Sequence, residues 1–237
     1  MEEKIQQDIF ALADEKYKEF HSSLCPGVST IVGVRIPVLR KYAKQLLKQM
    51  TNQELEQYLA YQGTYYEETM LQGMLIGLSK IEWNKKKEWI QAFVPKIDNW
   101  AVCDIVCAGI KEAKKEILQE DIWNFLLPYV QSDKEFEFRF GIVMWLDHFV
   151  NKTYIEEILD RVDDVKCGAY YAHMAVAWLL SICYIHFPEQ TKQYLKDCKL
   201  DDATYQKAIQ KTIESYRVSA EEKEKLRVWK KDRVSIE

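Results

Sequence analysis

Glycine and proline are scarce in this sequence, with eight and five residues among 237. Both residue types occur where a chain reverses direction, so their scarcity disfavours folds made of many short strands and turns. Regular alternation of β-branched and polar residues is also missing, whereas apolar residues recur at spacings of three and four throughout. This periodicity is that of helices with one buried face, and it predicts an all-α protein.

Long apolar runs are missing as well. No stretch of about eighteen apolar residues occurs, so no segment is expected to span a membrane. The chain begins with the acidic, amphipathic segment MEEKIQQDIFALADEKYKEF rather than the basic leader and apolar core of a signal peptide. A cytoplasmic location is therefore expected. The six cysteines form no CxxC pair and lie mostly in apolar helical contexts, which predicts reduced thiols in the core.

The motifs of several common enzyme classes are missing too. The sequence has no glycine-rich phosphate loop, no GxSxG and no dinucleotide fingerprint, which disfavours kinases, hydrolases of the GxSxG type and dehydrogenases. Its histidines show neither HxxxH nor HxxH spacing. Cys103 and Cys107 are four residues apart, but no second pair completes a metal site. We expect neither a metal nor an organic cofactor.

The formal net charge is −4, and a field of that sign opposes indiscriminate binding to polyanions. Basic residues are nevertheless distributed unevenly. The segment RIPVLRKYAKQLLK, at 35–48, contains five of them and no acid, and residues 207–233 contain nine against five acids. A distribution of this kind can place a basic groove on an acidic protein.

Apolar periodicity and turn residues divide the chain into many helices of moderate length. The predicted helices are 3–20, a helix starting near Pro37, 52–61, 65–80, 84–93, 99–112, 118–130, 134–149, 153–162, 168–186, 188–196, 201–216 and 220–233. Pairs of helices recur at a spacing of roughly 35 to 40 residues. This spacing predicts HEAT-like helical-hairpin repeats stacked into a curved α-solenoid with a concave binding face. One domain over residues 1–237 is expected. Because the repeats share no exact motif, a compact helical bundle is the structural alternative.

Three predicted helices each carry an unusual side chain. Trp100 and Asp104 are four residues apart in NWAVCDIVCAGIK, so a helix places both on one face among apolar neighbours. Arg139 lies on an apolar stripe, where its guanidinium must meet a carboxylate, a phosphate or a π face. Trp178 lies on a helix that is apolar nearly all round. The alternatives are a capping or salt-bridged aspartate beside a core tryptophan, an arginine extended over the rim of the core, and a second core tryptophan.

Together these residues resemble the AlkD family of DNA alkylation repair glycosylases, which are built from HEAT-like helical repeats. The active-site WxxxD of the family is matched by Trp100 and Asp104 in NWAVCD. The family's arginine is matched by Arg139 in FRFGI, and its second groove tryptophan by Trp178 in MAVAW. The separations between these sites agree with the family without insertion, and GVRIPVLRKYAKQL is similar to its N-terminal G-x-x-x-P-x-x-R signature. The resemblance spans nearly the whole chain.

The resemblance implies a monofunctional glycosylase that releases cationic bases such as 3-methyladenine and 7-methylguanine from duplex DNA without flipping them. Positive charge then develops on the deoxyribose, where an anion and π faces stabilise it. In this chain Asp104 is the expected anion, and it also positions the attacking water. Trp100 and Trp178 are expected to pack on the sugar, and Arg139 to hold a backbone phosphate.

Further phosphate contacts are expected in the basic segments near both ends of the chain. The hypothetical contacts are Arg40, Lys41, Lys44, Lys207, Lys211 and Arg217. Solvated surface charge is the competing interpretation for each of them. The partner is thus double-stranded DNA containing alkylated bases, and a monomer is expected because a solenoid with charged helices at both ends needs no other subunit.

Two features depart from the family pattern. The net charge is acidic, and bulky side chains precede Trp178 by one or two turns, namely Tyr170, Tyr171, His173 and Met174. The alternative function is therefore a non-catalytic relative that keeps the fold and binds damaged or branched DNA by its backbone. A helical-repeat scaffold for another protein is a third hypothesis, favoured only by the acidic balance.

Overall fold

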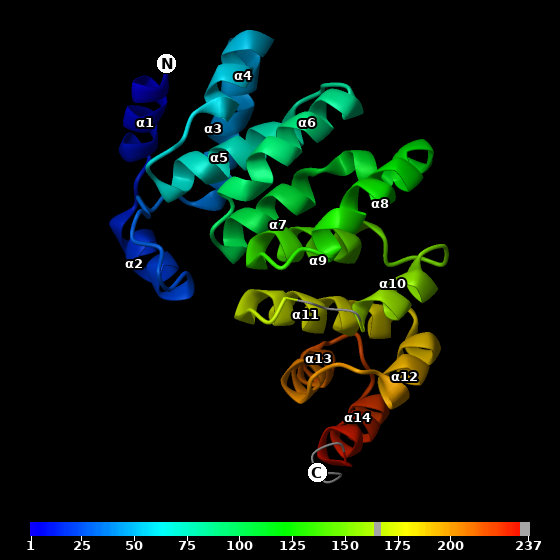
Figure 1. The fold of residues 1–237 in the computed structure, drawn as a ribbon. Coiled ribbons are helices and arrows are strands. Elements are labelled where there is room, and N and C mark those ends of the chain that lie inside the picture. Colours follow the sequence, from blue (N-terminus) through cyan, green and yellow to red (C-terminus); the bar gives the residue numbers. More distant parts are fainter. Residues whose placement is uncertain (164–166, 233–237) are drawn as a thin grey trace. The chain divides into compact units, whose positions relative to one another are not determined.

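A computed structural model describes residues 1–163 and 167–232 of the protein (Figure 1). The described residues form fourteen α-helices and two short 3-10 helices, and no described residue is in a strand. The prediction of an all-α protein is therefore confirmed. The chain divides into two compact units, residues 1–119 and 120–237. No described helix combines the length and the apolar character needed to cross a membrane.

The first unit stacks its helices in two rows. Helix α5 contacts α3 on one side and α7 on the other, while α4 contacts α6 in the second row (Figure 1). Its elements are α1 (Glu2–Ala11), α2 (Glu15–Leu24), α3 (Ile36–Gln49), α4 (Asn52–Ala60), α5 (Tyr66–Leu78), α6 (Trp83–Phe93), η1 (Val94–Lys96), α7 (Trp100–Gly109) and η2 (Lys111–Lys114). Helix α8 (Glu116–Val130) begins in this unit and ends in the next.

The second unit repeats the same arrangement. Helix α11 contacts α9 and α13, and α10 contacts α12. Its elements are α9 (Glu135–His148), α10 (Ile155–Val162), α11 (Tyr170–His186), α12 (Pro188–Asp197), α13 (Asp202–Glu214) and α14 (Ala220–Asp232). Two rows of hairpins are the packing of helical repeats rather than of one bundle around one core. The curvature of the whole stack, its concave face and the single domain stay predictions, and Arg233, the predicted end of the last helix, lies outside the described residues.

The predicted first helix, 3–20, is wrong in its extent, because the chain turns between α1 and α2. Asp14 ends the interruption by capping α2, where its side chain accepts a hydrogen bond from the backbone N–H of Tyr17 at 3.0 Å. Arg35 contributes an ion pair to the same carboxylate at 2.8 Å. Within α1, Ile5 and Ile9 are buried, whereas Phe10 is 47% exposed and its ring contacts the Tyr65 ring edge-on.

Two glycines let α5 and α7 approach closely. A Cβ atom on Gly77 would lie 2.9 Å from the Cα atom of Gly109, which is too short for two carbon atoms not bonded to each other. Backbone therefore packs on backbone where these helices cross. The crossing fixes α7, the helix that carries Trp100 and Asp104, against the centre of the first unit.

Two adjacent carboxylates are buried in the first turn of α5. Glu67 accepts hydrogen bonds from the backbone N–H groups of Val32, Gly33 and Val34 at 2.8, 2.7 and 3.0 Å. Its side chain thus replaces the strand partner that this extended segment does not have. Glu68 accepts from two N–H groups, those of residues 64 and 65, through its Oε2 atom. Its Oε1 atom is buried and has no hydrogen-bond partner.

A buried ion pair joins α6 to η2. The ammonium group of Lys86 lies 2.7 Å from Glu112 Oε1, and it also donates to the backbone carbonyl of Ser79 at 2.8 Å. The Lys86 side chain is fully buried, and the Oε2 atom of Glu112 is buried without a hydrogen-bond partner.

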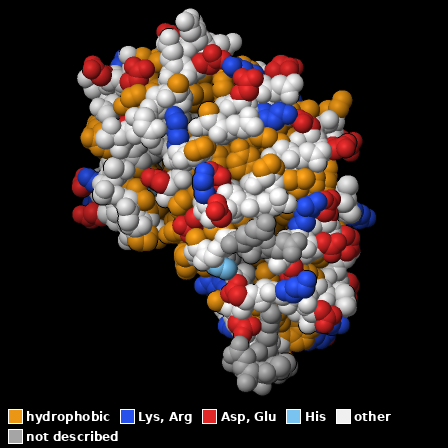
Figure 2. Space-filling view, viewed as in Figure 1, with side chains coloured by type: hydrophobic (Ala, Val, Ile, Leu, Met, Phe, Trp, Pro, Cys, Tyr) orange, Lys and Arg blue, Asp and Glu red, His pale blue; other side chains and the backbone are white. Residues whose placement is uncertain are grey.

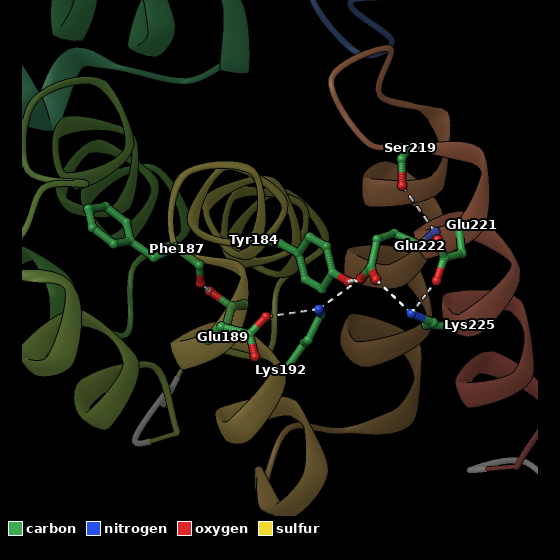
Figure 3. A network of polar contacts seen from close by, with 9 residues as sticks. Tyr184, Phe187, Glu189, Lys192, Ser219, Glu221, Glu222 and Lys225 are labelled. Atoms are coloured by element: carbon green, nitrogen blue, oxygen red, sulfur yellow. Dashed lines mark hydrogen bonds and ion pairs between the residues drawn. The ribbon is translucent and has the colours of Figure 1, made fainter.

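A polar network ties the last helices of the second unit together (Figure 3). The Tyr184 hydroxyl on α11 donates to Glu222 Oε2 on α14 at 2.7 Å, and Lys192 on α12 lies 2.9 Å from the same oxygen. Lys225 adds a contact of 3.1 Å to the other carboxylate oxygen. The hydrogen bond from Tyr184, followed by those from Lys192 and Lys225, lowers the pKa of Glu222 to about 2.

Candidate functional site

Helix α7 presents Trp100 and Asp104 on one partly exposed stripe. The helix begins at Trp100 because the side chain of Asn99 accepts a hydrogen bond from the backbone N–H of Val102 at 2.9 Å. Its opposite face is buried and comprises Ala101, Val102, Cys103, Val106 and Cys107. Trp100 and Asp104 are half-buried, and Ala108, the next residue along the stripe, is exposed. The predicted spacing on one helical face is therefore confirmed.

The indole of Trp100 is held from a different helix. Its Nε1–H donates to the backbone carbonyl of Leu24, the last residue of α2, at 3.0 Å. The carbonyls of the last turn of a helix have no partner within the helix, so that of Leu24 is available for this bond. The contact joins residues 76 positions apart. Sequence reasoning missed it, because no local spacing connects α2 to α7.

Asp104 places a carboxylate at the edge of an apolar surface. Its neighbours in the chain, Cys103 and Val106, are fully buried, whereas the Asp104 side chain is in part accessible to solvent. Because α7 is pinned by Gly109 and by the Asn99 cap, this carboxylate has a defined position on the helix. The arrangement offers one anion beside one aromatic π system at the protein surface, which suits a ligand that carries or develops positive charge.

A cluster of polar side chains lies behind the α2 end of this surface. His21 Nε2 is 2.7 Å from the hydroxyl of Tyr66, and the His21 ring stacks on Tyr17 with the ring centres 5.3 Å apart. Burial lowers the pKa of His21, although the charge of Glu67 opposes this. Burial also raises the pKa of the Cys25 thiol, whose sulfur is 3.7 Å from His21 Nε2. The cluster therefore consists of neutral groups at neutral pH.

The basic residues of α3 face different neighbours along the helix. Lys41 is exposed and lines a groove together with α1, whereas Lys44 and Lys48 line a groove together with α4 and the turn after α5. Arg40 is half-buried. None of these four side chains makes an ion pair or hydrogen bond with any residue that the structure describes. Four unpaired cations on one helix are available to phosphates.

Arg139 is buried on α9, with its side chain 5% exposed. Its Nη1–H donates to the backbone carbonyl of Tyr171 on α11 at 3.1 Å. The backbone N–H of the same Tyr171 donates to Glu135 at 2.6 Å, so two residues of α9 hold the first turn of α11. The sequence predicted that this guanidinium needs a carboxylate, a phosphate or a π face, and the structure places the Tyr171 carbonyl among its partners.

Trp178 is half-buried in the middle of α11. Of the bulky residues that precede it, Tyr170 is 66% exposed, and His173 contacts Thr204 and Asp201 at 2.5 and 3.2 Å. His173 thereby links α11 to the N-terminal cap of α13 rather than filling open space.

The predicted cations of the second unit are on or after α13. Lys207 is exposed, Lys211 is half-buried, and Arg217 is exposed in the turn before α14. On the face drawn in Figure 2, acidic and basic side chains are interspersed. The first unit therefore carries Arg40, Lys41, Lys44, Trp100 and Asp104, and the second carries Arg139, Trp178, Lys207, Lys211 and Arg217.

The described part of the chain has no group of three or more histidine, cysteine or acidic side chains arranged to hold a metal ion. All six cysteines lie in the described residues and none of them forms a disulfide; five are buried and Cys198 is half-buried.

One comparison with known proteins gives a match. The family described as "DNA alkylation repair enzyme" matches residues 5–216, which include most of each unit and every predicted site residue except Arg217. No curated protein matches the sequence significantly.

Proposed function

Since the chain belongs to the DNA alkylation repair enzyme family, we propose that it is a DNA glycosylase acting on cationic N3- or N7-alkylated purines. The observation that carries the proposal is the stripe of α7, on which a fixed Trp100 and a partly exposed Asp104 lie one turn apart. An anion and a π face side by side fit a reaction whose transition state gains positive charge on a sugar.

The chemistry asks little of the protein beyond this electrostatic help. An alkylated base such as 7-methylguanine carries a positive charge, so the electron pair of the breaking C1′–N bond neutralises the leaving base. No general acid is required for that step. A water molecule then bonds to C1′ and gives up one proton, and Asp104 is the group placed to orient this water and to stabilise the oxocarbenium ion.

The remaining assignments rest on the resemblance. Trp178 is proposed to contact the deoxyribose, and Arg139 to contact a backbone phosphate near the lesion. The flanking phosphates are proposed to be bound by the basic residues of both units, namely Arg40, Lys41, Lys44, Lys207, Lys211 and Arg217. Recognition of the lesion through the DNA backbone leaves the alkylated base stacked in the duplex, so the proposed mechanism requires no pocket for an extruded base.

A specific observation favours a second candidate, a non-catalytic protein that binds damaged or branched DNA. The guanidinium of Arg139 is buried and already donates to the carbonyl of Tyr171. It has to become accessible at the surface before it can bind a phosphate. A protein that recognises only the DNA backbone through other cations has no such requirement.

The decisive experiment measures the release of 7-methylguanine and 3-methyladenine from methylated duplex DNA by the parent protein, by Asp104→Asn and by Asp160→Asn. Asp160 is exposed on α10 and serves as the matched control. We expect release by the parent and the control, and a loss of about a hundredfold or more in Asp104→Asn. Duplex binding that persists in all three proteins, without base release in any, would support the non-catalytic candidate.

Salt dependence separates both DNA-binding candidates from a protein scaffold. Each phosphate contact contributes roughly 0.9 to the slope of log affinity against log salt concentration, so Lys44→Gln should lower that slope by about one. Lys85→Gln is the control and should leave the slope unchanged, because the ammonium group of Lys85 already pairs with Glu56 and Glu88, each at 3.1 Å. An affinity that does not change with salt would point to the scaffold.

A further inference from the structure

Helix α2 has one buried side chain, and that side chain is a histidine. Every residue of α2 is described, and among them only His21 is buried. The large apolar residues of the same end, Phe20 and Leu24, are 59% and 44% exposed. A surface helix normally derives its attachment from an apolar stripe, so α2 depends to an unusual degree on polar contacts.

The two ends of α2 are held by different groups. The first turn is attached through Asp14, which pairs with Arg35 and whose N–H donates to the carbonyl of Gly33 at 3.0 Å. The last turn is attached through His21, whose Nε2 lies 2.7 Å from the hydroxyl of Tyr66 at the start of α5. The Leu24 carbonyl that holds Trp100 belongs to this last turn.

These contacts connect three helices of the first unit, α2, α5 and α7, each to the other two. Helix α5 packs directly against α7 and also holds the end of α2 through Tyr66 and His21. The end of α2 in turn holds the indole of Trp100 on α7. The position of the indole therefore depends on the hydrogen bond between His21 and Tyr66.

We propose that His21 is a positioning residue for Trp100, acting through the last turn of α2. The indole has no other hydrogen bond to a described residue, so a displaced Leu24 carbonyl releases it to rotate. The groups that face His21 are Tyr17 and Cys25 around α2, and Tyr66 and Glu67 on α5. Burial lowers the pKa of His21, which keeps the ring uncharged and suited to a short bond with a phenol.

The proposal rests on the proposed glycosylase function only for its kinetic consequence. Its structural consequence is measured without DNA, by fluorine NMR of the protein labelled with 5-fluorotryptophan, in which Trp100→Phe identifies the signal of Trp100. Tyr66→Phe removes the hydroxyl that His21 contacts and keeps the ring. Tyr58→Phe is the matched control, because the buried Tyr58 hydroxyl has no hydrogen-bond partner among the described residues.

We expect Tyr66→Phe and His21→Leu to shift or broaden the Trp100 signal while circular dichroism shows an intact helical fold. His21→Gln places an amide near the position of Nε2, so it should restore the parent signal in part. Tyr58→Phe should leave the signal unchanged. If the parent protein releases 7-methylguanine, Tyr66→Phe should also reduce the single-turnover rate by about tenfold while DNA affinity stays constant.

A Trp100 signal that stays in place in folded Tyr66→Phe and His21→Leu would overturn the proposal and reduce His21 to a core residue. The same conclusion follows if Tyr58→Phe moves the signal as much as Tyr66→Phe does. Absence of base release in the parent protein would count against the proposed function alone, since the NMR result does not depend on activity.

Discussion

Replacing the carboxylate of Glu67 with an amide tests how the extended segment before α3 is held. Glutamine offers one oxygen, which can keep the N–H groups of Gly33 and Val34, but its NH₂ group then faces the N–H of Val32. One buried donor loses its acceptor, at about 1–3 kcal/mol, and the other two bonds lose their charge assistance. We expect Glu67→Gln to lower the free energy of unfolding by about 3 kcal/mol.

The neighbouring Glu68 provides a matched control. Its Oε2 atom accepts hydrogen bonds from the N–H groups of Thr64 and Tyr65, while Oε1 is buried and has no partner in the part of the chain that the structure describes. An amide oxygen at the Oε2 position keeps both bonds, and the NH₂ group replaces Oε1, so no backbone donor loses its acceptor. Glu68→Gln should therefore cost about 1 kcal/mol or less.

Urea unfolding followed by circular dichroism measures both variants, provided that the dependence of the unfolding free energy on urea is unchanged. The reasoning predicts a clear order, with Glu67→Gln the less stable protein. Equal losses in the two variants would refute it, because they would mean that the number of backbone donors at each carboxylate does not determine the cost. So would a Glu67→Gln protein as stable as the parent.

Two further predictions concern packing and pH. Gly77→Ala places a Cβ atom 2.9 Å from the backbone of Gly109 and should cost about 2 kcal/mol or more. Gly168→Ala, whose new Cβ has no atom of a described residue within 4 Å, should change thermal stability little. Similar melting temperatures of the two variants would contradict this account of the helix crossing. The pKa of Glu222 is about 2 in the folded protein, against an ordinary value of 4.5. The ionised Glu222 therefore contributes fully to the stability of the protein above pH 4.5, and this contribution is lost as the pH falls toward 2. Tyr184→Phe should therefore reduce the loss of stability that occurs as the pH falls from 4.5 toward about 2. An unchanged pH dependence in urea unfolding would argue against the network in Figure 3.

The sequence predicts those features of the fold that depend on local spacing. Apolar periodicity identified the helices, and the four-residue separation of Trp100 and Asp104 placed them on one face of α7. The first helix was predicted too long because Asp14 reads equally well as a solvated residue within a helix and as the cap of a new one. Arg35, which pairs with the capping carboxylate, lies 21 positions further along the chain.

Contacts between distant segments were beyond prediction from one sequence. The buried stripe of α9 indicated that Arg139 needs a partner, but the carbonyl of Tyr171 carries no side-chain signal. His21 gave no signal either, since its partner Tyr66 is 45 positions away and α2 lacks the apolar stripe that would mark a buried face. The roles of Trp178 and of the basic residues stay predictions for the same reason, because a function in binding DNA leaves no fixed spacing.

The ion pair between Lys86 and Glu112 constrains how this sequence can change over evolutionary time. Loss of either partner leaves an uncompensated charge in the core, at about 3–5 kcal/mol, which is a large part of the stability of an ordinary domain. Replacement of both by apolar residues is expected to be nearly neutral. A change from the ion pair to two apolar residues therefore has to pass through a protein with one unpaired buried charge, which is of low fitness. Descendants of this protein should keep both charges or lose both, and a lineage with only one should carry a compensating change nearby.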